Sequence, residues 1–197
     1  MASNKPSPPL LVLASESPRR AALLAQAGVT PGLIRGAAID ETPCKDELPR
    51  LHAERLAEEK ARKIAADAGG ALVLAADTVV ACGRRILPKA ENDGQVRACL
   101  ALLSGRSHQV ITAVALIDGD GKLHGRSVLT RVKFKRLDRI EIDAYISCGE
   151  GVGKAGGYAI QGRAEAFVRG LNGSYSNVVG LPLSETVALL RGCGWKC

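Results

Sequence analysis

The chain has 197 residues and a formal net charge of +7, and 46% of its residues are hydrophobic while only 3% are aromatic. This composition excludes a disordered chain, and the length suits one domain with a substantial core. No apolar run approaches the roughly 18 residues that a membrane span requires. The run at 10–14 is too short and too poorly flanked for a secretory signal. We therefore expect a cytoplasmic protein with no membrane partner.

The basic excess indicates an anionic partner, which could be nucleic acid, a membrane or a phosphorylated small molecule. Six aromatic side chains are too few for the stacking platforms that bind single-stranded nucleic acid. No basic helix with an apolar opposite face occurs, which argues against membrane docking. The alternating Arg131, Lys133 and Lys135 are typical of the solvent face of an antiparallel strand. The sequence therefore favours a phosphorylated small molecule over nucleic acid.

The cysteines and histidines show no metal-binding pattern. No CxxC pair occurs, the three histidines have no zinc-ligand spacing, and Cys193 and Cys197 form the one close cysteine pair. Reduced thiols acting as small hydrophobic side chains are the expectation for a cytoplasmic protein. The six are Cys44, Cys82, Cys99, Cys148, Cys193 and Cys197.

The predicted elements indicate a flexible arm over 1–9 followed by one domain over 10–197. Ser17 and Ser184 are expected to cap helices, and Pro18 suits a first helical turn. Helices are predicted at 19–27, 48–68, 92–103, 138–148 and 184–191. Strands are predicted at 10–14, 32–39, 71–76, 78–82, 85–87, 108–118, 122–136, 158–160 and 166–168. Hairpins joined at Gly83 and at 119–121, together with a βα start, predict an α/β fold with a mixed sheet.

The segment 15–20, Ser-Glu-Ser-Pro-Arg-Arg, lies between a predicted strand and a predicted helix. A helix N-terminus offers free backbone N–H groups and the positive end of the helix dipole. Arginine in a first turn opposes that dipole, so Arg19 and Arg20 indicate a bound phosphate, with an ordinary helix N-cap and solvated arginines as the alternative.

Acidic residues follow two predicted strands. Asp77 follows the apolar run 71–76, so we expect it at the carboxyl end of a central strand, where α/β sheets bind ligands. A carboxylate there suits a divalent cation or a general base. The pair Asp40 and Glu41 follows the strand at 32–39 and could hold a metal, although spacing alone favours a solvated loop.

The glycine-rich segment 149–157 only approximates two phosphate-binding motifs. Its GxGxxG pattern follows a helix and precedes a strand-like segment, which reverses the dinucleotide-binding order. It is one residue too short for a P-loop, and Ala155 replaces the hydroxyl that would reach Mg²⁺. The segment is expected to be a flexible loop whose Lys154 can close on an anion.

These segments resemble the motifs of the Maf family of nucleoside triphosphate pyrophosphatases. The matching stretches run in family order along nearly the whole chain, from about residue 10 to 190. They are 13–20, Asp40-Glu41, 56–61, 76–80, 103–105 with His108, 153–162, 173–175 and 177–183.

The resemblance implies hydrolysis of a nucleoside triphosphate to the monophosphate and pyrophosphate with Mg²⁺ or Mn²⁺. It implies an elongated mixed sheet with flanking helices and two lobes around a central cleft, similar to the inosine triphosphate pyrophosphatases. Asp77 would be the catalytic acid-base residue, Glu41 and Asp77 would bind the metal, and Lys60 would join the catalytic set. Substrate-binding residues would be Ser15, Ser17, Arg19, Arg20, Thr78, Lys89, Lys154 and Gln161.

Arg19, Thr78 and Gln161 are similar to the branch of the family that prefers dTTP and UTP. One departure is Pro88-Lys89-Ala90, where the family usually has Lys-Pro, so the position of Lys89 is less securely carried over. Alternatives are a 7-methyl-GTP or broad-specificity pyrophosphatase, and a non-catalytic regulator of septum formation. The family also suggests a homodimer, with the strand carrying Val132 and Phe134 as one candidate contact.

Overall fold

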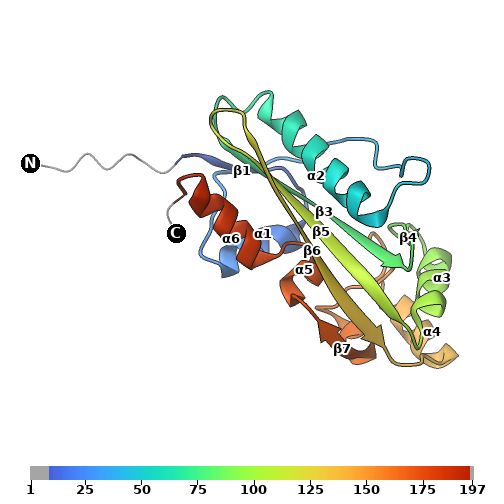
Figure 1. The fold of residues 1–197 in the computed structure, drawn as a ribbon. Coiled ribbons are helices and arrows are strands. Elements are labelled where there is room, and N and C mark those ends of the chain that lie inside the picture. The colour runs from blue at the N-terminus through green and yellow to red at the C-terminus, as the bar shows by residue number, and fades with distance from the viewer. Residues whose placement is uncertain (1–8, 196–197) are drawn as a thin grey trace, which may run out of the picture.

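The structure, a computed structural model, describes residues 9–195. Apart from residue 9, the expected N-terminal arm lies outside the described residues, and so does Cys197. The chain folds as an elongated mixed sheet with helices on both faces (Figure 1), which confirms the predicted fold class.

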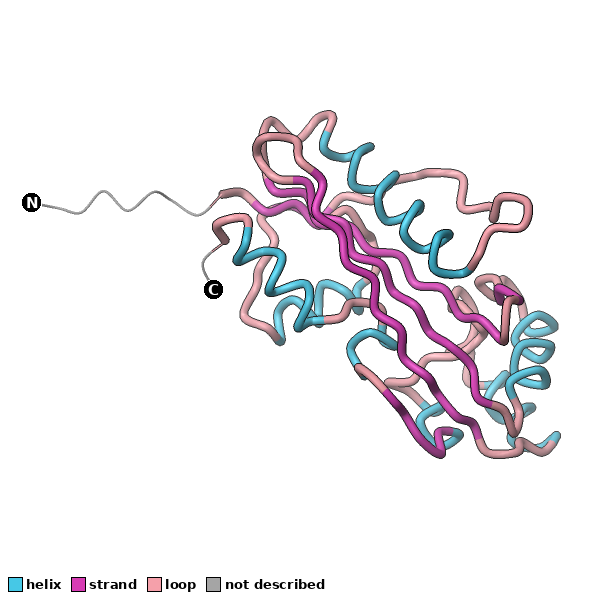
Figure 2. The backbone as a smooth tube through the Cα atoms, viewed as in Figure 1, coloured by secondary structure: helices cyan, strands magenta, loops and turns pink. Residues whose placement is uncertain are grey.

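The seven-stranded sheet has the order β2-β1-β3-β5-β6-β7, with the short β4 also paired to β3. β1 runs parallel to β2 and β3, and every other pairing is antiparallel. Figure 2 shows that β3, β5 and β6 are long strands lying side by side along the molecule. The strands are β1 (Leu11–Leu13), β2 (Leu33–Ile34), β3 (Leu72–Cys82), β4 (Arg85–Leu87), β5 (Ser107–Ile117), β6 (Leu123–Phe134) and β7 (Val168–Asn172).

The helix α2 covers one face of the sheet, and the remaining helices lie on the other face or at its ends (Figure 1). Alternation along β3 divides the core, because Leu72 and Leu74 join the larger cluster while Val73 and Ala75 face α2. The helices are α1 (Pro18–Gln26), α2 (Pro49–Ala65), α3 (Asp93–Leu103), α4 (Arg139–Ser147), α5 (Tyr175–Val179) and α6 (Leu183–Gly192), with a 3₁₀ helix at Arg163–Phe167.

The two predicted serine caps do not form as expected. Ser17 occupies the N-cap position of α1, but its side chain makes no capping hydrogen bond. Ser184 lies inside α6, whose N-cap is Pro182. The side-chain caps observed in the described residues belong to other helices: Asn92 caps α3, Asp138 forms a capping box with Glu141 in α4, and Ser174 caps α5.

Several strand predictions are wrong. The segments 71–76 and 78–82 form one continuous strand, so Asp77 lies in the middle of β3 and not at its carboxyl end. Segment 158–160 is a loop, and residues 163–167 are a 3₁₀ helix that leads into β7. The strand predicted at 32–39 pairs only over β2. Each error arises where local apolar content alone suggested a strand boundary.

The proposed dimer contact through Val132 and Phe134 is also wrong. Both side chains are buried within the chain, with 0% and 1% of their surface exposed. β6 is not the edge of the sheet, because β7 pairs with it through Val132 and Leu171. The homodimer stays a prediction, without this contact to support it. The solvent-face prediction is confirmed at Arg131 and Lys133, which are exposed on the same strand.

Among residues 9–195, no helix is both long and apolar enough to cross a membrane. The five cysteines in this part of the chain are free thiols, as the sequence predicts: Cys44, Cys82, Cys99, Cys148 and Cys193.

One titratable side chain is enclosed by the core. His108 is 2% exposed and lies edge-on to Phe134 and Tyr158, whose hydroxyl is 2.7 Å from Nε2. Nδ1 has no hydrogen-bond partner within the described residues. Burial therefore lowers the pKa of His108 to about 4.

We predict that acid destabilises the fold through His108. The unfolded chain binds a proton there near pH 6.5, whereas the folded chain does so only near pH 4. The free energy of unfolding should therefore fall by about 2 kcal/mol between pH 7 and pH 5 from this group. Urea denaturation of the wild type and of His108→Gln at both pH values measures the difference. An equal loss in the variant would contradict the assignment.

Candidate active site

The central strand β3 lacks a neighbour along part of one edge. β1 pairs with β3 only as far as Leu74, and β4 pairs with β3 only from Val80 onward. On the other edge β5 pairs with β3 throughout this stretch. Residues 75–79 therefore border a gap between two strands, and a cleft of about 710 Å³ lies there.

The cleft gathers every residue to which the family resemblance gave a site role, although these come from six separate segments. The residues are Ser15, Ser17, Arg19, Arg20, Glu41, Lys60, Asp77, Thr78, Lys89, Lys154 and Gln161. Asp40, the other member of the predicted acidic pair, does not line the cleft. Its carboxylate accepts from the backbone N–H of Thr42 and so shapes the loop instead.

Some lining residues were not singled out from the sequence. Tyr158 and residues 178–180 belong to segments that matched the family motifs, so the resemblance could have identified them. Glu16 lies within the matched segment 13–20, whereas residues 36–38 carried no such pattern. A Cβ on Gly36 would lie 2.3 Å from the Glu16 carboxylate, so a larger residue there would have to displace the exposed Glu16 side chain.

A buried lysine connects two carboxylates on the α2 side of the cleft. Asp77 lies on the same face of β3 as Ala75 and Val79, which pack toward α2. Its side chain therefore faces α2, and it is 4% exposed. Lys60 Nζ lies 2.6 Å from Asp77 Oδ1 and 2.6 Å from Glu41 Oε1. Buried charges are tolerated when they are paired in this way.

The amphipathic pattern of α2 explains why Lys60 points inward. Ala53, Ala57, Ala61 and Ile64 form its buried stripe, and Lys60 lies on the same face with 7% of its surface exposed. The small alanines let the helix approach the sheet closely, so the lysine reaches the strand that carries Asp77.

Glu41 is held in an ionised form. Partial burial raises its pKa, but hydrogen bonds from Lys60 and Lys89 outweigh burial and bring the pKa to about 2. Its loop is anchored to α2, because Arg55 donates to both oxygens of Glu47 and to the backbone carbonyl of Thr42. The loop therefore presents a charged carboxylate to the cleft in a fixed position.

The opposite face of β3 carries Thr78, which lies within a hydrogen-bonded network. Arg20 donates to Thr78 Oγ1 at 3.3 Å, to Ser15 Oγ at 3.0 Å and to the Gly180 carbonyl at 2.9 Å. Thr78 Oγ1 is also 3.0 Å from Thr112 Oγ1 on β5. Arg20 therefore joins the start of α1 to the central strands and positions the residues around it.

Arg19 and Lys154 differ from the two paired lysines of the cleft. Neither forms an ion pair within the described part of the chain, whereas Lys60 and Lys89 do. Burial lowers the pKa of Lys154, and the neighbouring Arg19 lowers it further. Burial lowers the pKa of Arg19 as well. Two cations that repel each other beside free space form a site for an anion.

Backbone hydrogen bonds dock the glycine-rich segment onto the loop that carries Lys89. Gly153 N donates to Ala90 O at 2.7 Å, Ala90 N to Lys154 O at 3.0 Å, and Gly156 N to Pro88 O at 3.2 Å. Lys89 and Lys154 are thereby fixed on neighbouring segments. The departure at 88–90 does not remove Lys89 from the cleft, and the segment expected to be flexible is anchored in this structure.

The remaining candidates lie at the cleft surface. Gln161 is exposed, and its amide makes no hydrogen bond within the described residues. Ser17 leaves its hydroxyl free because it does not cap α1. Both side chains are available for a ligand, as is the start of α1, where backbone N–H groups lack a side-chain acceptor.

Comparisons with known proteins find similar chains. A protein named dTTP/UTP pyrophosphatase from Caulobacter vibrioides is 61% identical to this chain, over 95% of this chain and 97% of that protein. A protein of the same name from Paramagnetospirillum magneticum is 59% identical, over 94% of this chain and 98% of that protein. A similar protein of the same name from Brucella abortus is 59% identical over 94% and 92%.

Among solved structures, a HAM1 protein from Coxiella burnetii is similar in fold, with a TM-score of 0.50, 15% identity and coverage of 92% of this chain and 98% of that chain. The sequence model described as Maf-like protein matches residues 10–193. Because this match spans nearly the whole chain, the chain belongs to the Maf family.

Proposed function

We propose that the protein hydrolyses dTTP and UTP to the nucleoside monophosphate and pyrophosphate, with Mg²⁺ or Mn²⁺. One observation carries the proposal. A single cleft holds carboxylates bridged by Lys60 on one wall and the cations Arg19 and Lys154, without acidic partners, on the other. The names of the similar proteins give the substrate class.

The polyphosphate lies along the basic wall. Arg19, Lys154 and the start of α1 neutralise the β- and γ-phosphates, so negative charge that builds up on the leaving pyrophosphate is stabilised where it develops. Lys89 contributes at the same end because its segment is bonded to that of Lys154. This orientation directs the α-phosphorus toward the carboxylates.

Asp77 acts as the general base. It takes a proton from the attacking water, the water oxygen bonds to the α-phosphorus, and the bond to the bridging oxygen of pyrophosphate breaks. Lys60 keeps the Asp77 carboxylate oriented through the 2.6 Å contact at Oδ1. Oδ2 makes no hydrogen bond within the described residues, so it is available to the water.

The carboxylates of Glu41 and Asp77 fit a hard divalent cation, which prefers oxygen ligands. Both line the cleft, and Glu41 stays ionised because its pKa is about 2. When bound, the cation would lower the pKa of a water molecule and neutralise phosphate oxygens. Lys60 and Lys89 keep the two carboxylates from repelling each other before the ion binds.

Gln161 reads the base. Its amide both donates and accepts hydrogen bonds, as the edge of a pyrimidine requires, and it is exposed at the cleft. Thr78 and Arg19 complete the specificity set, Thr78 indirectly through its bond to Arg20.

A nucleotide panel tests the proposal. We expect dTTP and UTP to be cleaved faster than 7-methyl-GTP and the purine triphosphates, with pyrophosphate and not orthophosphate as the product. Activity should require Mg²⁺ or Mn²⁺ and disappear with a chelator. A preference for 7-methyl-GTP would instead support the alternative of a 7-methyl-GTP pyrophosphatase. No hydrolysis of any nucleotide would favour a non-catalytic regulator.

Asp77→Asn should lower kcat by at least about 100-fold, because general base catalysis contributes about 10²–10⁴. The amide is similar in size to the carboxylate, so the fold should survive, as circular dichroism can verify. Asp67→Asn is the matched control, since Asp67 forms only an exposed ion pair with Arg35. Turnover at the wild-type rate in Asp77→Asn would refute the role of Asp77.

Lys154→Ala should reduce kcat/KM by about 10- to 150-fold, the equivalent of one charged hydrogen bond of about 1.5–3 kcal/mol. Lys122→Ala is the control, because Lys122 is exposed and does not line the cleft. If both variants lose the same activity, Lys154 does not contact the substrate.

A further inference from the structure

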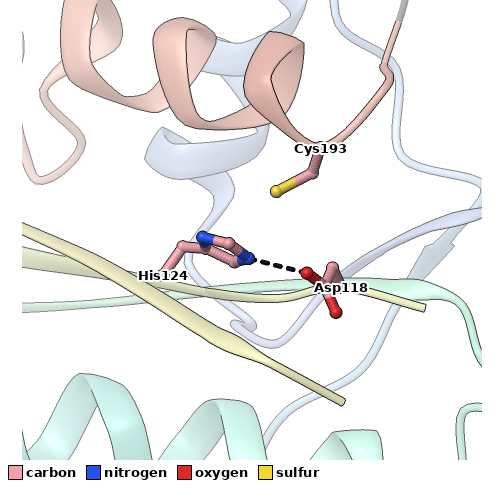
Figure 3. A group of neighbouring side chains, drawn as sticks. All are labelled: Asp118, His124 and Cys193. Carbon is pink, nitrogen blue, oxygen red and sulfur yellow. Dashed lines mark hydrogen bonds and ion pairs between the residues drawn. The ribbon is translucent and has the colours of Figure 1, made fainter. Parts of the chain in front are cut away.

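A second group of metal-ligating side chains lies away from the cleft. Asp118, His124 and Cys193 place one ligand atom each within 4.8 Å of one another, and all three side chains are partly buried (Figure 3). The pairing of β3 with β5 places Asp77 opposite Ala113, and Asp118 lies five residues beyond Ala113, just after the end of β5. At about 3.3 Å per residue the group is about 17 Å from the catalytic carboxylate.

Strand alternation explains how the first two ligands meet. His124 pairs with Leu116, which lies in the core on the α6 side of the sheet. Asp118 follows Leu116 by two residues and therefore projects to the same side. His124 Nε2 lies 2.6 Å from Asp118 Oδ2.

The third ligand comes from the end of a helix. Cys193 is the C-cap residue of α6, and its N–H donates to the carbonyls of Leu189 and Leu190 at 3.1 Å each. It packs against the core from the side that carries His124. Figure 3 shows its thiol directed toward the imidazole and the carboxylate.

The carboxylate is already oriented by a second layer of hydrogen bonds. Asp118 Oδ1 accepts from the backbone N–H groups of Asp120 and Lys122, at 3.0 Å and 2.9 Å. This leaves Oδ2 directed at His124. Such outer contacts are what fix ligands around a bound metal.

We propose that Asp118, His124 and Cys193 bind one Zn²⁺ ion, separate from the catalytic metal. Sulfur, nitrogen and oxygen ligands together suit a borderline cation such as Zn²⁺, whereas Mg²⁺ prefers oxygen ligands alone. Three protein ligands leave the fourth tetrahedral position for water. The ion would tie α6 to the β5–β6 hairpin.

Zinc binding requires the ligand atoms, which lie within 4.8 Å of one another, to shift by up to about 1.2 Å. Zinc bonds of about 2.0–2.3 Å in a tetrahedron place ligand atoms about 3.3–3.6 Å apart. The Asp118–His124 pair therefore opens by about 0.7 Å, and the ion replaces their hydrogen bond. Cys193 binds as the thiolate and releases its proton to solvent.

Zinc content and cobalt spectra test the proposal. The metal-free full chain should take up one Zn²⁺ and gain thermal stability, with no such gain from Mg²⁺. Co²⁺ in place of Zn²⁺ should give a thiolate-to-cobalt charge-transfer band. Both effects should be lost in Cys193→Ser, and zinc affinity should fall at least 100-fold in His124→Gln.

Cys148→Ser is the matched control, because Cys148 is also a partly buried helix C-cap thiol. It should bind zinc like the wild type, and so should Cys197→Ser. Zinc uptake that persists in Cys193→Ser and His124→Gln, uptake lost only in Cys197→Ser, or no uptake by the wild type would overturn the proposal. If Cys193→Ser fails to fold, loss of zinc affinity in His124→Gln but not in Cys197→Ser decides.

Discussion

The whole site depends on the interrupted edge of β3. A strand of 11 residues is paired completely on one side, while its other side is shared by β1 and β4, which meet it at opposite ends. The stretch between them exposes residues of both faces to one cleft. Asp77 thus reaches the cleft from the α2 face and Thr78 from the other, which a fully paired central strand would prevent.

This arrangement requires the charge balance around Lys60. A buried ammonium group is costly unless it is paired, and two carboxylates close together repel each other. Each group is tolerated because the others are present, so the cluster acts as a unit. On the basic wall the balance is incomplete, since Arg19 and Lys154 have no acidic partner in the described residues. Under the proposed function, this charge distribution places neutrality where water reacts and positive charge where phosphate binds.

The sequence allowed the fold class and the cleft residues to be predicted, because motif order and element order together restrict the topology. It did not reveal that Asp77 lies within a strand, since one carboxylate after an apolar run looks like a strand end. That side chain is accommodated only by Lys60, 17 residues earlier in the chain. Likewise, β7 covers Val132 because Val132 pairs with Leu171, which lies 39 residues later in the chain. The alternation of side chains within β6 cannot indicate this partner.

The same limit explains the second metal-ligating group. Asp118 and His124 are brought together by hairpin register, and Cys193 approaches from a helix 69 residues further along, so no spacing motif connects them. The two sites also separate cations by chemistry. In the proposed sites, the oxygen ligands of Glu41 and Asp77 would select a hard ion, whereas a thiolate and an imidazole would hold a softer ion more tightly. The chain would then hold the softer ion beside the β5–β6 hairpin without occupying the carboxylates of the cleft.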